Sequence, residues 1–445
     1  MLSVEENEIL TRVGPGTLLG DLMRQYWIPA LKSDEVPLPD SPPVRLKLLG
    51  EELIGFRTTS GDVGIVANSC PHRGASMFFG RNEEDGLRCV YHGWKFDVTG
   101  ACVDMPSEPA ESNFKSKVRT RAYPTRERNG VIWTYMGPRE IAPPLPELEP
   151  NVLAGGPVQK FLRDCSWLQS FEGDMDTTHI GFLHFGHVRA EDVEPKSMDY
   201  YTLKIRDPKM MVVDTEFGYT YGNYRPAEED TTYWRIAQYL YPFYSMPPTG
   251  ILGERMAVIA IVPVDDAHSM RWQMGGPPGQ GAMARRFGVI GPAYAPHPEL
   301  AGYAPETGGF MGKYRLKLNK ANDYGIDRER QRTMESWTGI WGIGDQDHAM
   351  VESMGDIYDR TREHLATSDL GVIRLRRLLL KHANALRADG TTPPGVDEPE
   401  VYKVRSGGIV LPNGVDGVKE TWDLQRVRVD KYAIPAATHL ENHGV

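Results

Sequence analysis

Four metal-binding side chains fall in two short segments, and they constrain the fold of this chain more than any other feature. Cys70 and His72 form a Cys-x-His pair, and after sixteen intervening residues Cys89 and His92 form a Cys-x-x-His pair. Each pair mixes one thiolate with one imidazole, so one metal centre is expected to draw on both segments. The chain must therefore bring two loops of one domain together.

Short apolar runs typical of strands lie on both sides of these pairs. The runs are 44–49, 52–57, 63–67, 94–97 and 131–135, with turns at Gly50 and at Thr99-Gly100. Gly74 and Gly93 follow the two pairs closely. At these positions we expect a tight bend and a close approach of the backbone to the metal centre. The pattern predicts a small all-β domain whose loops hold the metal.

Two metal centres use such donors. A Rieske [2Fe–2S] cluster is held by two cysteines on one iron and two histidines on the other. A tetrahedral zinc site also accepts two cysteines and two histidines. Zinc fingers usually place cysteine with cysteine and histidine with histidine, whereas each pair here contains one of each. The spacing therefore favours the iron–sulfur cluster, with zinc as the alternative.

A second set of candidate ligands lies further along the chain. His179 and His184 are five residues apart, and Asp345 and Asp347 follow far downstream. Two histidines and one carboxylate on one face of Fe(II), with the other positions open, form the site of non-haem oxygenases. From the residues alone, a structural histidine pair is the alternative, and either aspartate could complete the site.

Composition excludes several classes of protein. The chain has 445 residues and a net charge of −10, and no block of lysine and arginine suggests a nucleic-acid binder. No apolar run is long enough to span a bilayer, and the acidic N-terminus lacks a signal peptide. Four cysteines argue against a disulfide framework. We therefore expect a cytoplasmic protein without membrane or nucleic-acid partners.

The second half of the chain alternates strand-like and helical patterns, which predicts an α+β domain. Strands are expected at 210–214, 233–241 and 255–264, and helices at 165–185 with a break near Gly173, 327–337, 349–364 and 370–386. A basic cluster is interpreted as a solvated helix face, with a patch that docks an acidic redox partner as the alternative; it contains Arg374, Arg376, Arg377 and Lys381. The GGPPGQG segment at 275–281 is interpreted as a loop, because no strand–turn–helix frames it. The chain is thus not expected to take hydride from NADH itself.

The segments CPHRGA (70–75) and CVYHGWK (89–95) resemble the two Rieske boxes of aromatic ring-hydroxylating oxygenases. Residues 172–184 resemble the mononuclear iron box of the same family, and the likeness extends over nearly the whole chain. It is greatest to the phthalate dioxygenase-like group, which has α subunits only. The resemblance implies an α+β protein with a Rieske all-β domain inserted after a short helical segment (1–137, core about 42–137). A Pro-rich linker (138–150) and a helix-grip, START-like catalytic domain with an antiparallel sheet (151–445) follow.

The resemblance also assigns roles to residues. Cys70, His72, Cys89 and His92 would bind the [2Fe–2S] cluster. In the family the aspartate ligand lies five residues before the Glu of Glu-Ser-Met-Gly, here Glu352, which points to Asp347 beside His179 and His184 as ligands of mononuclear Fe(II). Gln346 and His348 depart from the usual order, so Asp345 stays an alternative. Asp176 would join a mononuclear-iron histidine to a cluster histidine of the neighbouring subunit, the alternative being an ordinary helix acid.

As implied by the family, the partners are O₂, a small aromatic substrate and a separate reductase with flavin and ferredoxin-type iron–sulfur groups. The assembly is expected to be a homotrimer or a dimer of trimers. We expect hydroxylation, cis-dihydroxylation or O-demethylation of a carboxylated, possibly lignin-derived, aromatic compound. Arg206, Phe243 and Tyr244 are substrate candidates, with surface salt bridges and ordinary core as their alternatives. The competing function is a Rieske electron carrier without oxygenase chemistry.

Overall fold

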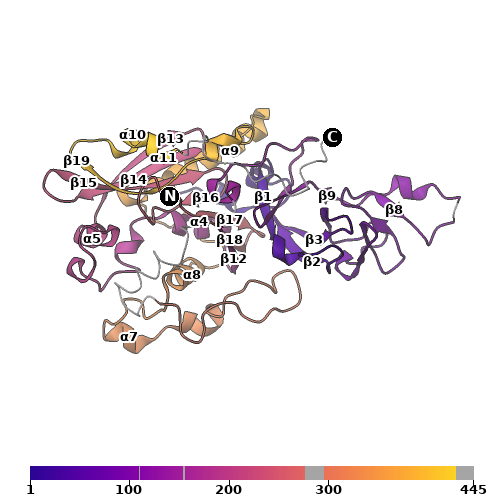
Figure 1. Ribbon diagram of the computed structural model, residues 1–445, viewed down its shortest axis with the longest axis horizontal. Coiled ribbons are helices and arrows are strands. Elements are labelled where there is room, and N and C mark those ends of the chain that lie inside the picture. Colours follow the sequence, from indigo (N-terminus) through magenta and orange to yellow (C-terminus); the bar gives the residue numbers. More distant parts are fainter. Residues whose placement is uncertain (110, 154–155, 276–294, 427–445) are drawn as a thin grey trace.

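The computed structural model describes residues 1–109, 111–153, 156–275 and 295–426. Residues 276–281 of the GGPPGQG segment therefore lie outside the described residues. Figure 1 shows small sheets of N-terminal strands at one end of the molecule and a large sheet flanked by helices at the other. In the described part of the chain, no helix has the length and apolar character needed to cross a membrane.

The N-terminal segment forms two short helices, α1 (Val4–Thr11) and α2 (Leu18–Met23). Thr17 caps α2 by accepting a hydrogen bond from the Gly20 amide. Both helices contact the long C-terminal helix α9 (Leu370–Asp389). The N-terminal helices thus pack against a helix from the C-terminal part of the chain.

The predicted small strands of the N-terminal part are confirmed, and they form three antiparallel sheets. The first has the order β2 (Val44–Leu48), β3 (Glu51–Arg57), β4 (Val63–Ala67) and β9 (Ala122–Tyr123). The second has the order β5 (Arg81–Glu83), β6 (Gly86–Arg88), β7 (Lys95–Phe96) and β8 (Cys102–Asp104). The third has the order β1 (Trp27–Lys32), β11 (Val131–Tyr135) and β10 (Thr125–Arg128).

The large sheet is antiparallel throughout. Its order is β12 (Val158–Arg163), β18 (Ser269–Met274), β17 (Val258–Pro263), β16 (Tyr244–Met246), β15 (Thr231–Leu240), β14 (Gly218–Pro226) and β13 (Lys209–Thr215), and β19 (Gly407–Pro412) also pairs with β15. The predicted strands β13, β15 and β17 are confirmed. Strand β14 was not predicted, because its Gly222, Asn223 and Pro226 are uncommon in strands.

Two of the predicted helices have different bounds. Helix α4 (Trp167–Met175) continues through Gly173 and is followed by its C-cap residue Asp176. The Asp176 side chain accepts a hydrogen bond from the Thr178 amide, which favours a turn over further helix. Gly173 marks a close approach instead, since a Cβ there would lie 2.7 Å from Val351 of α8. Helix α8 (Ile343–Ser353) begins earlier and ends earlier than the predicted 349–364, because Gly355 has a left-handed φ of 89°.

The prediction of a helix over 327–337 was largely wrong. Only α7 (Arg328–Arg332) is helical there, and the left-handed φ of Met334 (59°) prevents it from continuing. The remaining α-helices of the described residues are α3 (Glu149–Val152), α5 (Met198–Lys204), α10 (Gly417–Glu420) and α11 (Trp422–Gln425). In Figure 1, α7 and α8 lie below the large sheet, and α9 to α11 lie above it.

One apolar core joins the N-terminal segment to the large sheet. Trp27 and Trp133 of the three-stranded sheet share it with Phe171 of α4 and Leu375 of α9. A separate core lies under the metal-binding loops and contains Cys70, Cys89 and Cys102. The small strands that carry the first ligand set therefore have a core of their own.

Candidate metal centres

The first ligand pair lies in a tight loop after β4. The amide of Cys70 donates to the carbonyl oxygen of Ala75 (2.8 Å), and the amide of Gly74 donates to the carbonyl oxygen of Cys70 (2.9 Å). Gly74 has a φ of 77°, which glycine adopts without a steric penalty. The tight bend expected at this glycine is confirmed.

The second loop, between β6 and β7, repeats this geometry. The amide of Cys89 donates to the carbonyl oxygen of Trp94 (2.8 Å), and the amide of Gly93 donates to the carbonyl oxygen of Cys89 (2.9 Å). The φ of Gly93 is 79°. Two loops of the same shape therefore present one cysteine and one histidine each.

The side chains of the two loops converge. The ring centroids of His72 and His92 are 4.3 Å apart. Cys70 and Cys89 are both buried, and burial together with the neighbouring Cys89 thiol raises the pKa of Cys70 to about 11. The backbone amides of His72 and Arg73 donate to the Cys70 sulfur and oppose this rise. Such amides also stabilise a metal-bound thiolate.

The environment of His72 fits a metal ligand. Its Nδ1 atom is buried and has no hydrogen-bond partner among the described residues. A buried ring nitrogen without a partner is costly unless another group, such as a metal, takes its lone pair. The indole of Trp94 stacks on the ring at 4.3 Å and 14°, and its Nε1 donates to Ser107. The ring is thus held in one orientation.

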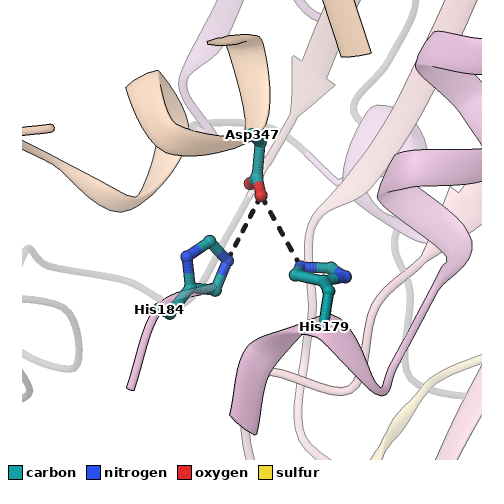
Figure 2. Close-up of side chains that lie close together, drawn as sticks. All are labelled: His179, His184 and Asp347. Carbon is teal, nitrogen blue, oxygen red and sulfur yellow. Dashed lines mark ion pairs between the residues drawn. The ribbon is translucent and has the colours of Figure 1, made fainter. Parts of the chain in front are cut away.

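The second ligand set comes together from two distant parts of the chain (Figure 2). His179 lies in a short 3₁₀ turn that follows α4, and Asp347 lies on α8. The Oδ1 atom of Asp347 is 3.2 Å from Nε2 of His184 and 3.6 Å from Nε2 of His179. One ligand atom from each residue lies within 4.8 Å of the others. Two imidazoles and one carboxylate therefore face one point, which is the donor set of a non-haem iron site.

The geometry separates Asp347 from its neighbours on α8. Residues two apart on a helix point to different sides, so Asp345 cannot share the face that Asp347 presents. Burial and the charge of Asp347 raise the pKa of Asp345 to about 6. His348 is buried and its Nε2 lies 3.4 Å from Glu352. Among these residues, only Asp347 belongs to the three-residue cluster.

The side chains of the cluster shift one another's pKa values. Burial alone would raise the pKa of Asp347, but His184 and His179 lower it to about 2. Burial alone would lower the pKa of His179, but the hydrogen bond to Asp176 and the charge of Asp347 raise it. A carboxylate beside two imidazoles is a strong site for a divalent cation.

His184 is the most deeply buried of the three ligands, with 4% of its side chain exposed. Its Nδ1 atom is 2.9 Å from Oε1 of Gln346, which precedes Asp347 on α8. In the sequence, Gln346 is only a departure from the order expected around Asp347. A single glutamine gives no signal in a sequence, because this contact depends on the approach of α8 to the histidine loop.

Asp176 lies on the other side of His179. Its Oδ2 atom is 3.5 Å from Nδ1 of His179, and its Oδ1 atom accepts hydrogen bonds from the amide and hydroxyl of Thr178, both at 2.7 Å. Burial alone would raise the pKa of Asp176, but His179 and Thr178 lower it. The side chain is 31% exposed, so this carboxylate reaches the surface.

Strand β14 holds the turn that carries Asp176. The hydroxyl of Tyr221 donates to the carbonyl oxygen of Met175 (2.8 Å), and Nδ2 of Asn223 donates to the hydroxyl of Thr177 (2.6 Å). Both donors are buried and lie two residues apart, on the same face of the strand. These contacts were missed because β14 itself was not predicted.

A buried ionic network anchors α4 one turn before Asp176. Glu172 accepts hydrogen bonds from Arg360 (3.1 Å) and from Nε of Arg376 (2.6 Å), and Arg376 also pairs with Glu363. Arg360 and Arg376 are buried, which corrects the interpretation of Arg376 as part of a solvated face. The carboxylates on α4 and before α9 draw this arginine inward.

The substrate candidate Arg206 contacts the loop that carries His179 and His184. Its guanidinium donates to the carbonyl oxygens of Gly181, Phe185 and Val188. Gly181 lies next to the alkyl part of Arg206, and a Cβ added at this glycine would be 3.6 Å from the Arg206 side chain. These contacts support the backbone around His184, and a role in substrate binding stays a prediction.

Phe243 and Tyr244 lie in the main core. They are 0% and 1% exposed, and the Tyr244 hydroxyl donates to the carbonyl oxygen of Trp27 at 3.3 Å. The ring of Tyr244 is 6.5 Å from that of Trp133. The observed contacts are those of core residues, so the substrate role of these two rings also stays a prediction without support from their packing.

Two family models match the chain. Residues 26–124 match the Rieske [2Fe-2S] domain. Residues 134–280 and 309–433 match a family described as LigXa C-terminal domain like. The two matches meet near residue 130, and together they include both candidate metal centres.

Similar proteins cover almost the whole chain. The oxygenase subunit of 3-chlorobenzoate-3,4-dioxygenase from Comamonas testosteroni is 44% identical over 94% of this chain and 97% of its own. The oxygenase subunit of phthalate 4,5-dioxygenase from Pseudomonas putida is 36% identical over 90% of both chains. Dicamba monooxygenase bound to dicamba has the same fold, with a TM-score of 0.55 and 16% identity over 82% of this chain and 99% of its own.

Proposed function

Because this chain belongs to the family of Rieske non-haem iron oxygenase α subunits, we propose that it inserts oxygen from O₂ into an aromatic carboxylate. The protein is an oxygenase that carries a Rieske [2Fe–2S] cluster and a mononuclear iron. The observation that supports the reaction best is the convergence of His179, His184 and Asp347 on one point.

We assign the cluster to Cys70, His72, Cys89 and His92. Their loops converge, and the buried Nδ1 atom of His72 has no other partner among the described residues. We assign the mononuclear iron to His179, His184 and Asp347. When bound, the cluster supplies single electrons, and the ferrous ion supplies open positions where O₂ is activated beside the substrate.

The residues around the second site have separate tasks in this proposal. Asp347 contributes the negative charge, and the two imidazoles contribute neutral donors through Nε2. Asp176 holds the Nδ1 proton of His179 and, being partly exposed, can accept a hydrogen bond from His72 or His92 of a neighbouring subunit. Asp176 is then the link between the cluster loops of one subunit and the iron ligands of the next.

This role for Asp176 requires more than one subunit. A head-to-tail contact that closes after three copies gives a ring in which every Asp176 meets the cluster loops of its neighbour. We therefore propose a homotrimer or a dimer of trimers. A strictly monomeric protein with full activity would contradict this assembly.

Electrons come from separate components in this family, and we propose a reductase with flavin and ferredoxin-type iron–sulfur groups. We also propose the division into a cluster domain to residue 137, a linker over 138–150 and a catalytic domain from 151. A cytoplasmic location stays a prediction.

The substrate proposal rests on two of the relatives that cover most of the chain. Their names specify 3-chlorobenzoate and phthalate, which are both aromatic carboxylates. O-demethylation of a methoxylated aromatic acid is the alternative outcome. It would release formaldehyde, because hydroxylation of a methoxy carbon gives a hemiacetal that collapses to a phenol.

The test is oxygen uptake by the holoenzyme with a surrogate reductase and a panel of benzoates, phthalates and methoxybenzoates. We expect substrate-dependent uptake with aromatic acids and hydroxylated ring products. Formaldehyde in proportion to oxygen uptake would identify demethylation instead. No uptake with any acid, despite a reducible cluster and a full complement of iron, would contradict the proposal and favour an electron carrier.

A further inference from the structure

We infer that Gln346 is a positioning residue for the mononuclear site, because its amide fixes the tautomer and orientation of His184. The inference rests on the proposed ligand set and adds a residue to it. Gln346 occupies the position just before Asp347 on α8, and its side chain contacts His184 of the three-donor cluster.

The hydrogen bonds define the direction of the Gln346 amide. Its Nε2 atom is 3.0 Å from the carbonyl oxygen of Ile340, and its Oε1 atom is 2.9 Å from Nδ1 of His184. A backbone carbonyl can only accept, so the amide nitrogen must face Ile340 and the amide oxygen must face His184. The amide oxygen also only accepts, so Nδ1 of His184 must carry the proton.

This tautomer leaves the lone pair on the other ring nitrogen. Nε2 of His184 is the atom that lies 3.2 Å from Asp347 in the cluster. In the opposite tautomer, Nε2 would carry the proton, and two acceptors would meet at Nδ1. Gln346 therefore excludes the form of His184 that cannot bind a metal through Nε2.

Burial makes the contact difficult to replace. Gln346 is 1% exposed and His184 is 4% exposed. Water has little access to either group, so loss of the amide would leave the Nδ1 proton without an acceptor. Without that bond, the ring could rotate or change tautomer at a lower cost.

The two histidine ligands are thus oriented by different groups. His179 has a partly exposed carboxylate, Asp176, at 3.5 Å from Nδ1, whereas His184 has a buried neutral amide at 2.9 Å. A neutral acceptor orients the deeper imidazole without adding a second negative charge beside Asp347. Gln346 and Asp347 are adjacent on α8. One helix therefore positions both the proposed ligand Asp347 and the residue that orients the other proposed ligand, His184.

The test measures Co(II) binding to the cluster-loaded protein after the mononuclear site has been emptied with a chelator. We compare Gln346→Leu with Gln346→Glu, which keeps an acceptor for His184. Gln169→Leu is the matched control, because Gln169 is equally buried and also donates to backbone carbonyls, those of Val351 and Gly355, without contacting a ligand. His184→Ala tests the ligand set itself.

We expect Gln346→Leu to weaken Co(II) binding by about 10- to 100-fold, as the loss of such partners usually does. Gln346→Glu should bind Co(II) more tightly than Gln346→Leu, and Gln169→Leu should bind it like the wild type. Cluster absorbance should be unchanged in all of them. If Gln346→Leu binds as Gln169→Leu does while His184→Ala loses the ion, this inference is wrong and the proposed function stands. Retention of Co(II) by His184→Ala would overturn the ligand set as well.

A measurement on the unaltered protein keeps the inference testable if a variant does not fold. Nitrogen-15 NMR of the histidine rings, with the cluster oxidised and the mononuclear site empty, reports the tautomer of His184. We expect the proton on Nδ1. A ring protonated on Nε2 alone would overturn the inference.

Discussion

The Oδ2 atom of Asp176 lies 3.5 Å from Nδ1 of His179, on the side of the ring away from Asp347. One imidazole thus has a carboxylate beside each of its two nitrogens, Asp347 within the cluster of three donors and Asp176 outside it, and both carboxylates are partly exposed. The proposed link between subunits depends on this arrangement.

Replacement of Asp176 by Asn should abolish most turnover and leave both metal centres loaded. The carboxylate of Asp176 orients His179 and would accept a hydrogen bond from a cluster histidine of the neighbouring subunit, and the amide of Asn lacks its negative charge. We therefore expect turnover to fall by about 10- to 100-fold or more. Single-turnover product formation with a pre-reduced cluster measures the effect, and Asp192→Asn, at an exposed acid, is the control. Normal product formation by the Asp176 variant would refute the link.

Replacement of Asp347 by Ala should remove the mononuclear iron and retain the cluster. Asp347 is the carboxylate within 3.2 Å of His184, whereas Asp345, two residues earlier, lies outside the cluster of three donors. Iron and acid-labile sulfide analysis measures both centres in one sample. If Asp345→Ala loses the iron and Asp347→Ala keeps it, the assignment of the ligand is wrong.

The four cysteines allow a matched comparison, since all of them are buried and free. Cys89→Ser should lose the visible absorbance of the cluster. Cys102→Ser, in the same apolar core, should keep it. A cluster that survives the loss of Cys89 would show that the loops bind the metal differently.

Glu172 should be important for stability through its two buried arginines. Burial alone would raise the pKa of Glu172, but Arg360 and Arg376 lower it. Glu172→Gln leaves both guanidinium groups without their shared carboxylate, and we expect the free energy of unfolding to fall by about 3–5 kcal/mol. Denaturant titration measures this loss, with exposed Glu191→Gln as the control. An unchanged free energy would show that the network does not stabilise α4.

Stability should depend on pH through the turn between β17 and β18. There His268 is 2.8 Å from Asp265, which also binds Lys47 of β2 at 2.7 Å. The hydrogen bond to Asp265 raises the pKa of His268. Burial alone would raise the pKa of Asp265, but His268 and Lys47 hold it well below its usual range.

The raised pKa of His268 gives a stabilisation that is complete below about pH 6.5 and is lost as the pH rises through the folded-state pKa. The lowered pKa of Asp265 gives one that is present above about pH 4 and is lost as the pH falls. The difference in unfolding free energy between the wild type and His268→Gln should therefore be largest at about pH 4 to 6.5. A difference that stays constant up to pH 9 would contradict this coupling.

The loops of the first candidate metal centre could be predicted almost completely from the sequence. The four proposed donors lie within 23 residues, from Cys70 to His92, so the loops that carry them are set by local spacing and by two glycines. The second centre was harder, because His184 and Asp347 meet only through the packing of α4 against α8. Asp347 was proposed as a ligand from the resemblance to a family, because spacing alone left Asp345 open.

The supporting residues could not be predicted, for physical reasons. Gln346, Tyr221 and Asn223 act through single hydrogen bonds to residues far away in the sequence. Such contacts leave no periodic pattern. Gly173 shows the same limit, since a glycine in a helical pattern can signal either a break or a close approach, and only the position of Val351 decides between them.

The central claim is that each chain holds a two-iron cluster and a separate mononuclear iron. Iron and acid-labile sulfide analysis of anaerobically loaded wild type and His184→Ala, with electron paramagnetic resonance of the reduced cluster, tests it most directly. We expect about three irons for about two sulfides in the wild type, and about two irons for about two sulfides in His184→Ala, with the same cluster signal in both. Equal iron content in the two proteins would contradict the account.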